Sequence, residues 1–301
     1  MSGHRAGVGY ALGAYVCWGF LPLYFKAIAN VPALEIVVYR VLFAALFLAL
    51  VLSYRRQFSW LKQVWADPRL IMRFSLSALL IGGNWLLYIY AINSGQIVES
   101  SLGYFINPLV AVALGALVLG ERLATPLWIA VLFALAGVAW LTWLVGRVPW
   151  IALGLALSFA CYGLMRKTAK LGSLEGLTLE TILLFVPALA LLGYLAAKGV
   201  SVSVHADLAL WLWLLLAGPA TAIPLLLFAA GARLLPLSTL GFLQYLSPSL
   251  QLFLGAVIFQ EPFDQQRLIG FALIWLGLLI LTAHLLLQAK RSSDAARAGA
   301  A

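Results

Sequence analysis

The sequence of 301 residues is 64% hydrophobic and only 10% charged, and its mean hydropathy is +1.03. Water-soluble domains are about half apolar and a quarter charged, so this composition excludes an ordinary soluble protein and predicts an integral membrane protein. The net charge of +9 does not indicate nucleic-acid binding, because the 19 lysines and arginines are scattered between apolar runs.

Ten apolar runs follow one another along the chain, each about long enough to cross a hydrocarbon core of about 30 Å as a helix. They span residues 7–29, 34–53, 71–93, 97–118, 126–145, 148–165, 177–197, 208–230, 237–259 and 267–287. Strands of membrane barrels alternate in polarity over about ten residues, and these runs do not. The sequence therefore predicts an all-α integral membrane protein with ten transmembrane helices and little chain outside the bilayer.

The basic residues predict the orientation of the chain. With a cytoplasmic N-terminus, 14 lysines and arginines fall on the cytoplasmic side, and three, Arg147, Lys198 and Arg267, fall outside. Cytoplasmic loops of membrane proteins carry such an excess of positive charge. Both termini are therefore expected in the cytoplasm, with residues 288–301 as a cytoplasmic tail.

The second half of the chain repeats part of the first half. At a constant offset of 140 residues, Pro108, Leu114-Gly115-Ala116 and Glu121 recur as Pro248, Leu254-Gly255-Ala256 and Glu261. This pattern predicts two five-helix repeats, at 7–145 and 148–287. Because five is an odd number, the second repeat would enter the bilayer inverted, an architecture typical of secondary transporters with a central site between the repeats.

Ionisable side chains inside the apolar runs are the first candidates for function, because each costs about 2.5–3.5 kcal/mol in hydrocarbon without a partner or water. Five are candidates: Lys26, Glu35, Arg40, Glu99 and Glu180. Lys26 and Glu35 lie near predicted helix ends, where they can serve as interfacial anchors. Arg40 lies deeper and needs an anion, either Glu99, Glu35 or a substrate carboxylate. Glu99, and after it Glu180, are the candidates for coupling transport to proton movement.

Polar and aromatic side chains also recur on single faces of the predicted helices. Examples are Glu99, Gly103 and Asn107 in one helix and Gln244, Ser247 and Gln251 in another. Such faces predict a polar cavity between the repeats; the alternative is hydrogen bonding between helices, worth about 0.6 kcal/mol per bond in membranes. The candidate substrate-binding residues are Arg40, Asn84, Trp85, Tyr88, Glu99, Tyr104, Asn107, Tyr162, Gln244 and Tyr245.

Several short motifs resemble those of a known family. They are Gly82-Gly83-Asn84-Trp85, the run from Glu99 to Leu109, Gly120-Glu121-Arg122, Pro224-Leu225-Leu226, and the run Leu237 to Phe242 followed by Gln244-Tyr245. The chain resembles the RarD-type, chloramphenicol-sensitivity permeases of the EamA branch of the drug/metabolite transporter superfamily over about residues 7–287. The resemblance implies a permease of the bacterial inner membrane with two EamA repeats, and it leaves the substrate open.

These observations predict a secondary transporter, a permease or exporter of small amphiphilic metabolites or drugs, working by alternating access, with proton coupling as one source of energy. The expected partners are a small-molecule substrate and the lipid bilayer, while the oligomeric state, monomer or homodimer, stays open. No phosphate-binding loop occurs, and the three histidines share no ligand spacing, so neither ATP, a metal nor another cofactor is expected. The alternatives are a non-transporting receptor or assembly scaffold and a membrane-embedded enzyme.

Overall fold

The computed structural model describes residues 2–94, 96–146, 148–203, 206–258 and 265–298, some of them by their backbone alone. Within these ranges all regular secondary structure is helical, which confirms the predicted all-α fold. The helices are α1 (Ser2–Ala27), α2 (Ala33–Arg55), α3 (Trp60–Ala66), α4 (Pro68–Asn93), α5 (Ile97–Leu117), α6 (Thr125–Val145), α7 (Trp150–Lys167), α8 (Ser173–Ala197), α9 (Leu208–Leu234), α10 (Leu237–Gln244), α11 (Leu246–Phe253) and α12 (Gln265–Ala298).

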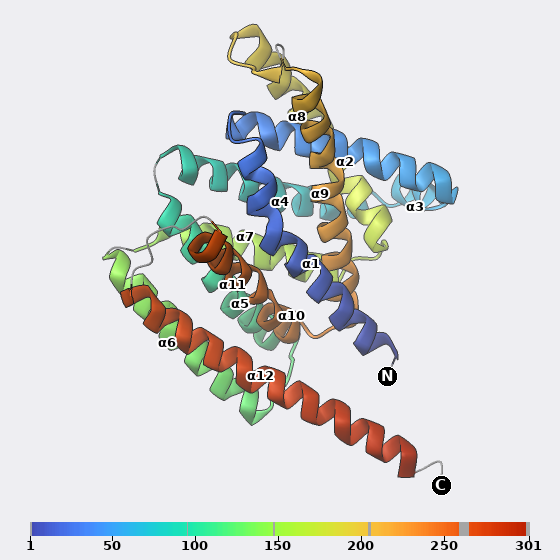
Figure 1. The fold of residues 1–301 in the computed structure, drawn as a ribbon. Helices are drawn as coiled ribbons and strands as arrows, with labels where there is room; N and C mark the ends of the chain where they lie inside the picture. The colour runs from blue at the N-terminus through green and yellow to red at the C-terminus, as the bar shows by residue number, and fades with distance from the viewer. Residues whose placement is uncertain (1, 95, 147, 204–205, 259–264, 299–301) are drawn as a thin grey trace.

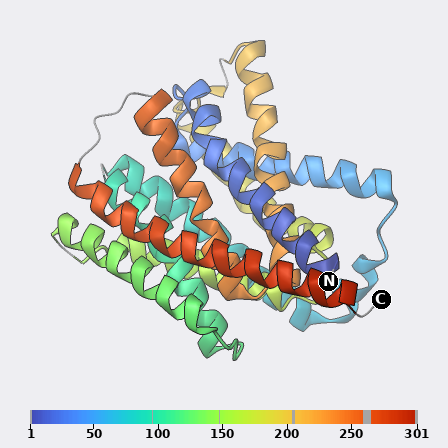
Figure 2. The ribbon, with the colours of Figure 1, turned by 60° about the horizontal axis from the view of Figure 1, so that its bottom comes forward.

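The long helices form one bundle, with both chain termini at the same end of it (Figures 1 and 2). Among the described residues, seven helices are long and apolar enough to cross a membrane: α1, α2, α4, α6, α8, α9 and α12. The positions of the other three predicted spans are occupied by α5, α7 and the pair α10–α11. The chain is thus an α-helical membrane protein, and the count of ten crossings stays a prediction.

The structure differs from the predicted helices at three places. The predicted loop around residues 54–70 contains the short helix α3, which is tied to the core because Trp60 and Val64 are buried. The predicted helix 237–259 is interrupted at Tyr245 and ends in a π-helical segment, Leu254–Ile258. Pro248 accounts for the interruption, since its ring has no N–H for the carbonyl four residues earlier. Finally, α12 continues through most of the predicted tail, to Ala298.

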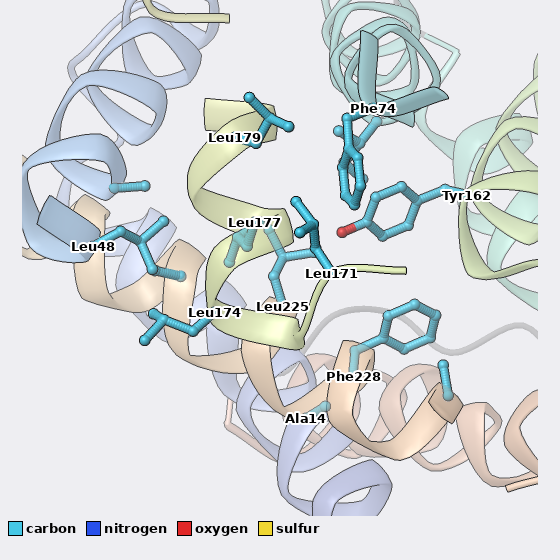
Figure 3. Packing of buried hydrophobic residues seen from close by; sticks show 14 of the residues in the cluster. Ala14, Leu48, Phe74, Tyr162, Leu171, Leu174, Leu177, Leu179, Leu225 and Phe228 are labelled. Atoms are coloured by element: carbon cyan, nitrogen blue, oxygen red, sulfur yellow. The ribbon is translucent and has the colours of Figure 1, made fainter. Parts of the chain in front are cut away.

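The two halves of the chain are packed into each other. The most extensive helix contacts join α6 to α12, α5 to α7 and α1 to α9, and each pair takes one helix from either half. The largest cluster of buried hydrophobic side chains also draws on both halves, with Ala14, Leu48 and Phe74 from the first and Leu177 and Phe228 from the second (Figure 3). The predicted repeats therefore form a single packed body.

A close helix approach joins α6 and α12, which run side by side (Figures 1 and 2). A Cβ atom placed at Gly137 of α6 would lie 2.5 Å from the carbonyl oxygen of Gly270 and 2.8 Å from a side-chain carbon of Ile274. A Cβ atom at Gly277 of α12 would lie 2.7 Å from the carbonyl oxygen of Ala130. Small residues let helix backbones touch in membranes, so glycine is required at this contact.

Gly137→Ala is expected to destabilise the protein by about 1–3 kcal/mol, because the added methyl group must push α6 and α12 apart. Gly83→Ala is the matched control, since a Cβ atom at Gly83 of α4 has no other atom within 4 Å. Alanine is a better helix former than glycine by about 0.5–1 kcal/mol, so the control should keep or raise stability. Thermal unfolding in detergent measures both, and equal melting temperatures would contradict the close α6–α12 contact.

Candidate functional site

An internal cavity of about 120 Å³ lies where helices from both halves meet. Its lining residues come from α1, α2, α4 and α5 of the first half and from α7, α9, α10 and α11 of the second. A water molecule needs about 10–15 Å³ by this measure, so the cavity has room for about ten waters, or a ligand of about that many non-hydrogen atoms. It combines several polar side chains with aromatic rings, as small-molecule sites generally do.

A larger groove, of about 1020 Å³, lies between α5, α6 and the start of α7, and it has a different character. Its lining is apolar apart from indole N–H groups and the hydroxyl of Thr142, which already donates to the carbonyl oxygen of Val138 at 2.8 Å. Such a surface suits lipid acyl chains and offers a polar substrate little to bind. The smaller cavity is therefore the candidate site.

Seven of the predicted substrate-binding residues lie in the wall of this cavity: Arg40, Asn84, Trp85, Tyr88, Tyr104, Asn107 and Gln244. They are separated by up to about two hundred residues in the sequence, and α2, α4, α5 and α10 bring them together. The polar face of Gln244, Ser247 and Gln251 also lines the cavity, across the interruption between α10 and α11.

The remaining predicted site residues lie elsewhere. Tyr162 and Tyr245 are buried outside the cavity wall, and their hydroxyl groups donate to Glu180 Oε2 at 3.2 Å and to the carbonyl oxygen of Phe105 at 3.2 Å. The Tyr162 hydroxyl points toward α8 (Figure 3). Both tyrosines thus join helices together. The side chain of Glu99 lies outside the described residues, although its backbone belongs to α5.

Two amides of the cavity wall hold helices together, as the alternative interpretation of the polar faces proposed. The Asn84 amide donates to the carbonyl oxygen of Leu155 and to Ser158 Oγ, both at 2.9 Å, and so joins α4 to α7. The Gln251 amide donates to the carbonyl oxygen of Trp18 at 3.0 Å and joins α11 to α1. Because these N–H groups already form hydrogen bonds within the protein, Asn84 and Gln251 have fewer free donors for a ligand than their position in the cavity wall indicates.

Unlike these two amides, the Asn107 amide has a buried oxygen atom without a hydrogen-bond partner in the described part of the chain. Its side chain is 3% exposed, and its buried Oδ1 atom has no hydrogen-bond partner among the described residues. A buried polar atom without a partner costs about 1–3 kcal/mol, so it is rare in a well-packed interior. Asn107 belongs to the cavity wall, but this Oδ1 atom is itself buried, so a ligand donor would reach it only after the wall rearranges.

Arg40 places a guanidinium group in the cavity wall. Its Nε atom donates to Thr221 Oγ1 at 3.0 Å, and its central carbon lies 4.7 Å from the ring centre of Trp85 and 5.9 Å from that of Phe25. A cation over an aromatic face is favourable by about 2 kcal/mol when both are desolvated. Among the described side chains no carboxylate forms an ion pair with Arg40. The expected pair with Glu99 stays a prediction, because that side chain lies outside the described residues.

Glu35, one of the partners expected for Arg40, has a different role. It is fully buried, and its carboxylate accepts hydrogen bonds from Ser201 Oγ at 2.7 Å and from the backbone N–H groups of Val202 and Ser203 at 3.0 Å. Of the two interpretations left open for Glu35, a side chain that extends to the interface is therefore excluded by its burial. Glu35 binds the loop between α8 and α9 to the start of α2, a contact across 166 residues of sequence.

A second buried carboxylate, Glu180 of α8, forms a separate polar cluster. Its side chain is 1% exposed and lies 3.4 Å from Arg166 Nη1, an equally buried partner on α7. It also accepts hydrogen bonds from Ser77 Oγ of α4 at 2.6 Å and from the Tyr162 hydroxyl. The cluster connects three helices, and it is not part of the cavity wall.

The acidic motif at Glu121 holds the start of α10. Its carboxylate accepts hydrogen bonds from the backbone N–H groups of Leu237 at 2.6 Å and Ser238 at 2.9 Å, and from Ser238 Oγ at 2.7 Å. Pro236, at the helix start, provides no side-chain cap, so Glu121 satisfies the free N–H groups and the positive helix end from the other half of the chain. We call this contact the Glu121 clasp. The corresponding Glu261 lies outside the described residues.

The cavity wall includes residues that were not among the sequence candidates. Trp18 and Phe25 of α1 line it, with Pro22 between them, and Thr221 of α9 binds Arg40. Trp18, Pro22 and Phe25 are spaced at i, i+4 and i+7, so their common helix face was a detectable signal. Nothing in the local sequence singles out Thr221, whose partner lies 181 residues away.

The helical bundle and its enclosed cavity define a polytopic membrane protein with an internal polar site of small-molecule size. The model of the EamA-like transporter family matches residues 5–143 and again 148–283. The chain therefore belongs to the EamA-like transporter family.

Its relatives support this assignment over nearly the whole chain. It is 45% identical to an uncharacterized transporter of Pseudomonas aeruginosa, over 90% of this chain and 92% of the relative. It is 43% identical to Protein RarD of Escherichia coli, over 96% of this chain and 98% of that one. The RarD-type resemblance is thereby confirmed. A solved crystal structure, 20% identical, shares the fold with a TM-score of 0.70 over 92% of this chain and 97% of that chain.

Arg166→Met is expected to destabilise the protein by about 3–5 kcal/mol, because it leaves the Glu180 carboxylate buried without a cation. The double variant Arg166→Met/Glu180→Met should recover most of this loss, since it removes both charges. Arg122→Met, at an exposed position, is the control and should change stability little. Unfolding midpoints in detergent test the cycle; a double variant no more stable than Arg166→Met would show that the pair is not coupled.

Proposed function

We propose that this protein is a secondary transporter that moves small amphiphilic metabolites or drugs across the bacterial inner membrane by alternating access, most simply as an exporter. The observation that carries the proposal is the cavity, which has polar and aromatic groups and is enclosed by helices of both halves. In transporters built from inverted repeats, the substrate site lies between the repeats. Relatives named as transporters support it, and one relative, 35% identical, is named a chloramphenicol-sensitive protein.

Alternating access requires that the two ends of the cavity open in turn. The Glu121 clasp supports a closing role at one end, because it binds the segment after α5 to the first residues of α10. Both helices contribute to the cavity wall. Opening at that end would separate the Glu121 carboxylate from three donors, and each such charge-assisted bond is worth about 1.5–3 kcal/mol.

Proton coupling is assigned to Glu99, with Glu180 as the second candidate. A carboxyl group can couple proton movement to transport if its proton affinity differs between the two conformations. Glu180 is supported as a candidate because its donors Ser77 and Tyr162 lie on α4 and α7, one from each half. Movement of one half against the other would change the hydrogen bonds that its carboxylate accepts.

Transport by the purified protein in liposomes tests this proposal. With an imposed pH gradient, wild-type protein should accumulate at least one small amphiphile from a metabolite extract, and Glu99→Gln should lose the accumulation while keeping downhill exchange. Glu175→Gln, outside the cavity wall, is the matched control and should behave like wild type. Unchanged pH-driven accumulation by Glu99→Gln would transfer the coupling role to Glu180. Absence of transport for every compound would favour a receptor or scaffold instead.

The same proposal places both termini in the cytoplasm, supported by the 14-to-3 charge count and by the termini lying at one end of the bundle (Figure 1). In a background with Cys17 and Cys161 replaced by alanine, Arg147→Cys should react with an impermeant thiol reagent in intact cells. Arg56→Cys should react only after the membrane is opened. The reverse pattern would overturn the orientation.

A further inference from the structure

Arg40 lies too deep in the bundle for its charge to be incidental. It is the eighth residue of α2 (Ala33–Arg55), and at 1.5 Å per residue it lies roughly 10 Å along the helix axis from the start. A cation at such depth is expensive unless it has a partner or a wet cavity. The cavity supplies the space, and the contacts of Arg40 show which partner it lacks.

Most of the hydrogen-bonding capacity of Arg40 is unused. A guanidinium group carries five N–H donors, and the structure gives Arg40 a single hydrogen bond, from Nε to Thr221. Its two Nη groups bond to none of the described residues. A buried atom without a partner would be exceptional, and neither Nη atom is one. They therefore retain accessible surface, and at this position that surface belongs to the cavity.

Three described carboxylates that could have neutralised Arg40 bind other groups instead. Among the described side chains, Glu180 pairs with Arg166 and Glu121 with Lys167, and Glu35 accepts its hydrogen bonds from Ser201, Val202 and Ser203. The aromatic faces of Trp85 and Phe25 hold the guanidinium group in place, but they do not neutralise it. The cavity therefore has a fixed positive charge with a planar set of free donors, and this geometry matches a carboxylate.

The wall of the cavity defines the rest of the ligand. Aromatic rings, including Trp85, Tyr88 and Tyr104, surround the space beside the guanidinium group. We infer that Arg40 is the anion subsite of the transport cavity. Its ligands are small carboxylates with an apolar or aromatic part. This inference rests on the proposed function, and it specifies the substrate class of the same site.

The stability of the ligand-free protein gives the first test. If Arg40 has no internal anion, Arg40→Met removes an uncompensated buried charge and should keep or raise the melting temperature. Arg166→Met is the matched control, because it breaks a buried ion pair and should lower the melting temperature. A fall for Arg40→Met as large as that for Arg166→Met would overturn the inference, since it would reveal an internal carboxylate partner. Glu99 would be the first residue to examine, through Arg40→Met/Glu99→Gln.

Ligand binding gives the second test, with defined probes. Benzoate, 3-phenylpropionate and phenylalanine are compared with their neutral-carboxamide analogues, benzamide, 3-phenylpropanamide and phenylalaninamide, by the rise in melting temperature with ligand concentration. Wild-type protein should bind at least one acid tenfold or more tightly than its amide. Arg40→Met should lose this preference, and Arg40→Lys should keep part of it, because lysine retains the charge without the planar donors. Equal responses to acids and amides, or no response to any acid, would overturn the inference.

Transport separates this inference from the proposed function. Liposomes that carry wild-type protein or Arg40→Met are loaded with the same six compounds, and uptake and efflux are followed. Arg40-dependent movement of an acid supports both claims. Movement of neutral or cationic compounds alone, unchanged in Arg40→Met, would overturn the anion subsite and leave the transporter intact. Arg40-dependent binding of acids without transport of any compound would support the subsite and overturn the transporter.

Discussion

Contact between helices of different halves of the chain is the constraint on which both the fold and the cavity depend. Lipid tails are as apolar as leucine, so helices in a bilayer gain little by hiding apolar surface and rely on close packing and hydrogen bonds. Here these interactions cross between the halves, at the glycines of α6 and α12, at the Asn84 amide, and at the Tyr15 hydroxyl, which donates to the Leu240 carbonyl. The cavity exists only where the two sets of helices meet.

The buried polar groups fall into two sets with different physical meaning. Glu35, Glu121 and Glu180 each accept several hydrogen bonds from segments distant in sequence, so their charges are compensated and they stabilise one arrangement of the chain. Arg40 and Asn107 have few partners or none, and both lie in the same cavity wall. Unsatisfied groups are costly at low dielectric. Two further buried atoms in the described part of the chain also lack a partner but lie outside the cavity wall: Trp60 Nε1 and Arg166 Nε. It is therefore the free donors of Arg40 that indicate a ligand.

The amino-acid sequence was sufficient for features that depend on composition and local spacing. The apolar runs predicted the helices closely, and the cost of a charge in hydrocarbon singled out Arg40. Features that depend on residues distant in the sequence could not be predicted from it. The role of Glu35 was not evident because its donors lie more than 160 residues away, and Tyr162 resembled a site residue until α8 supplied Glu180 as its acceptor. Pro108 and Pro248 are equivalent in sequence, yet only the segment around Pro248 is interrupted, so packing decides the outcome.

The pairing of α6 with α12 also has a consequence for biosynthesis. The 119 residues from Gly146 to Asp264 separate the two helices in the chain. At a translation rate of about 5–20 residues per second, α6 would wait roughly 6–24 seconds in the membrane before its partner is made. During that interval its Gly137 face can contact only lipid or the insertion machinery, and the same holds for the faces of α1 and α5 that later meet α9 and α7. The α6–α12 contact can thus form only late in synthesis, after the contacts of α5 with α7 and of α1 with α9 have become possible.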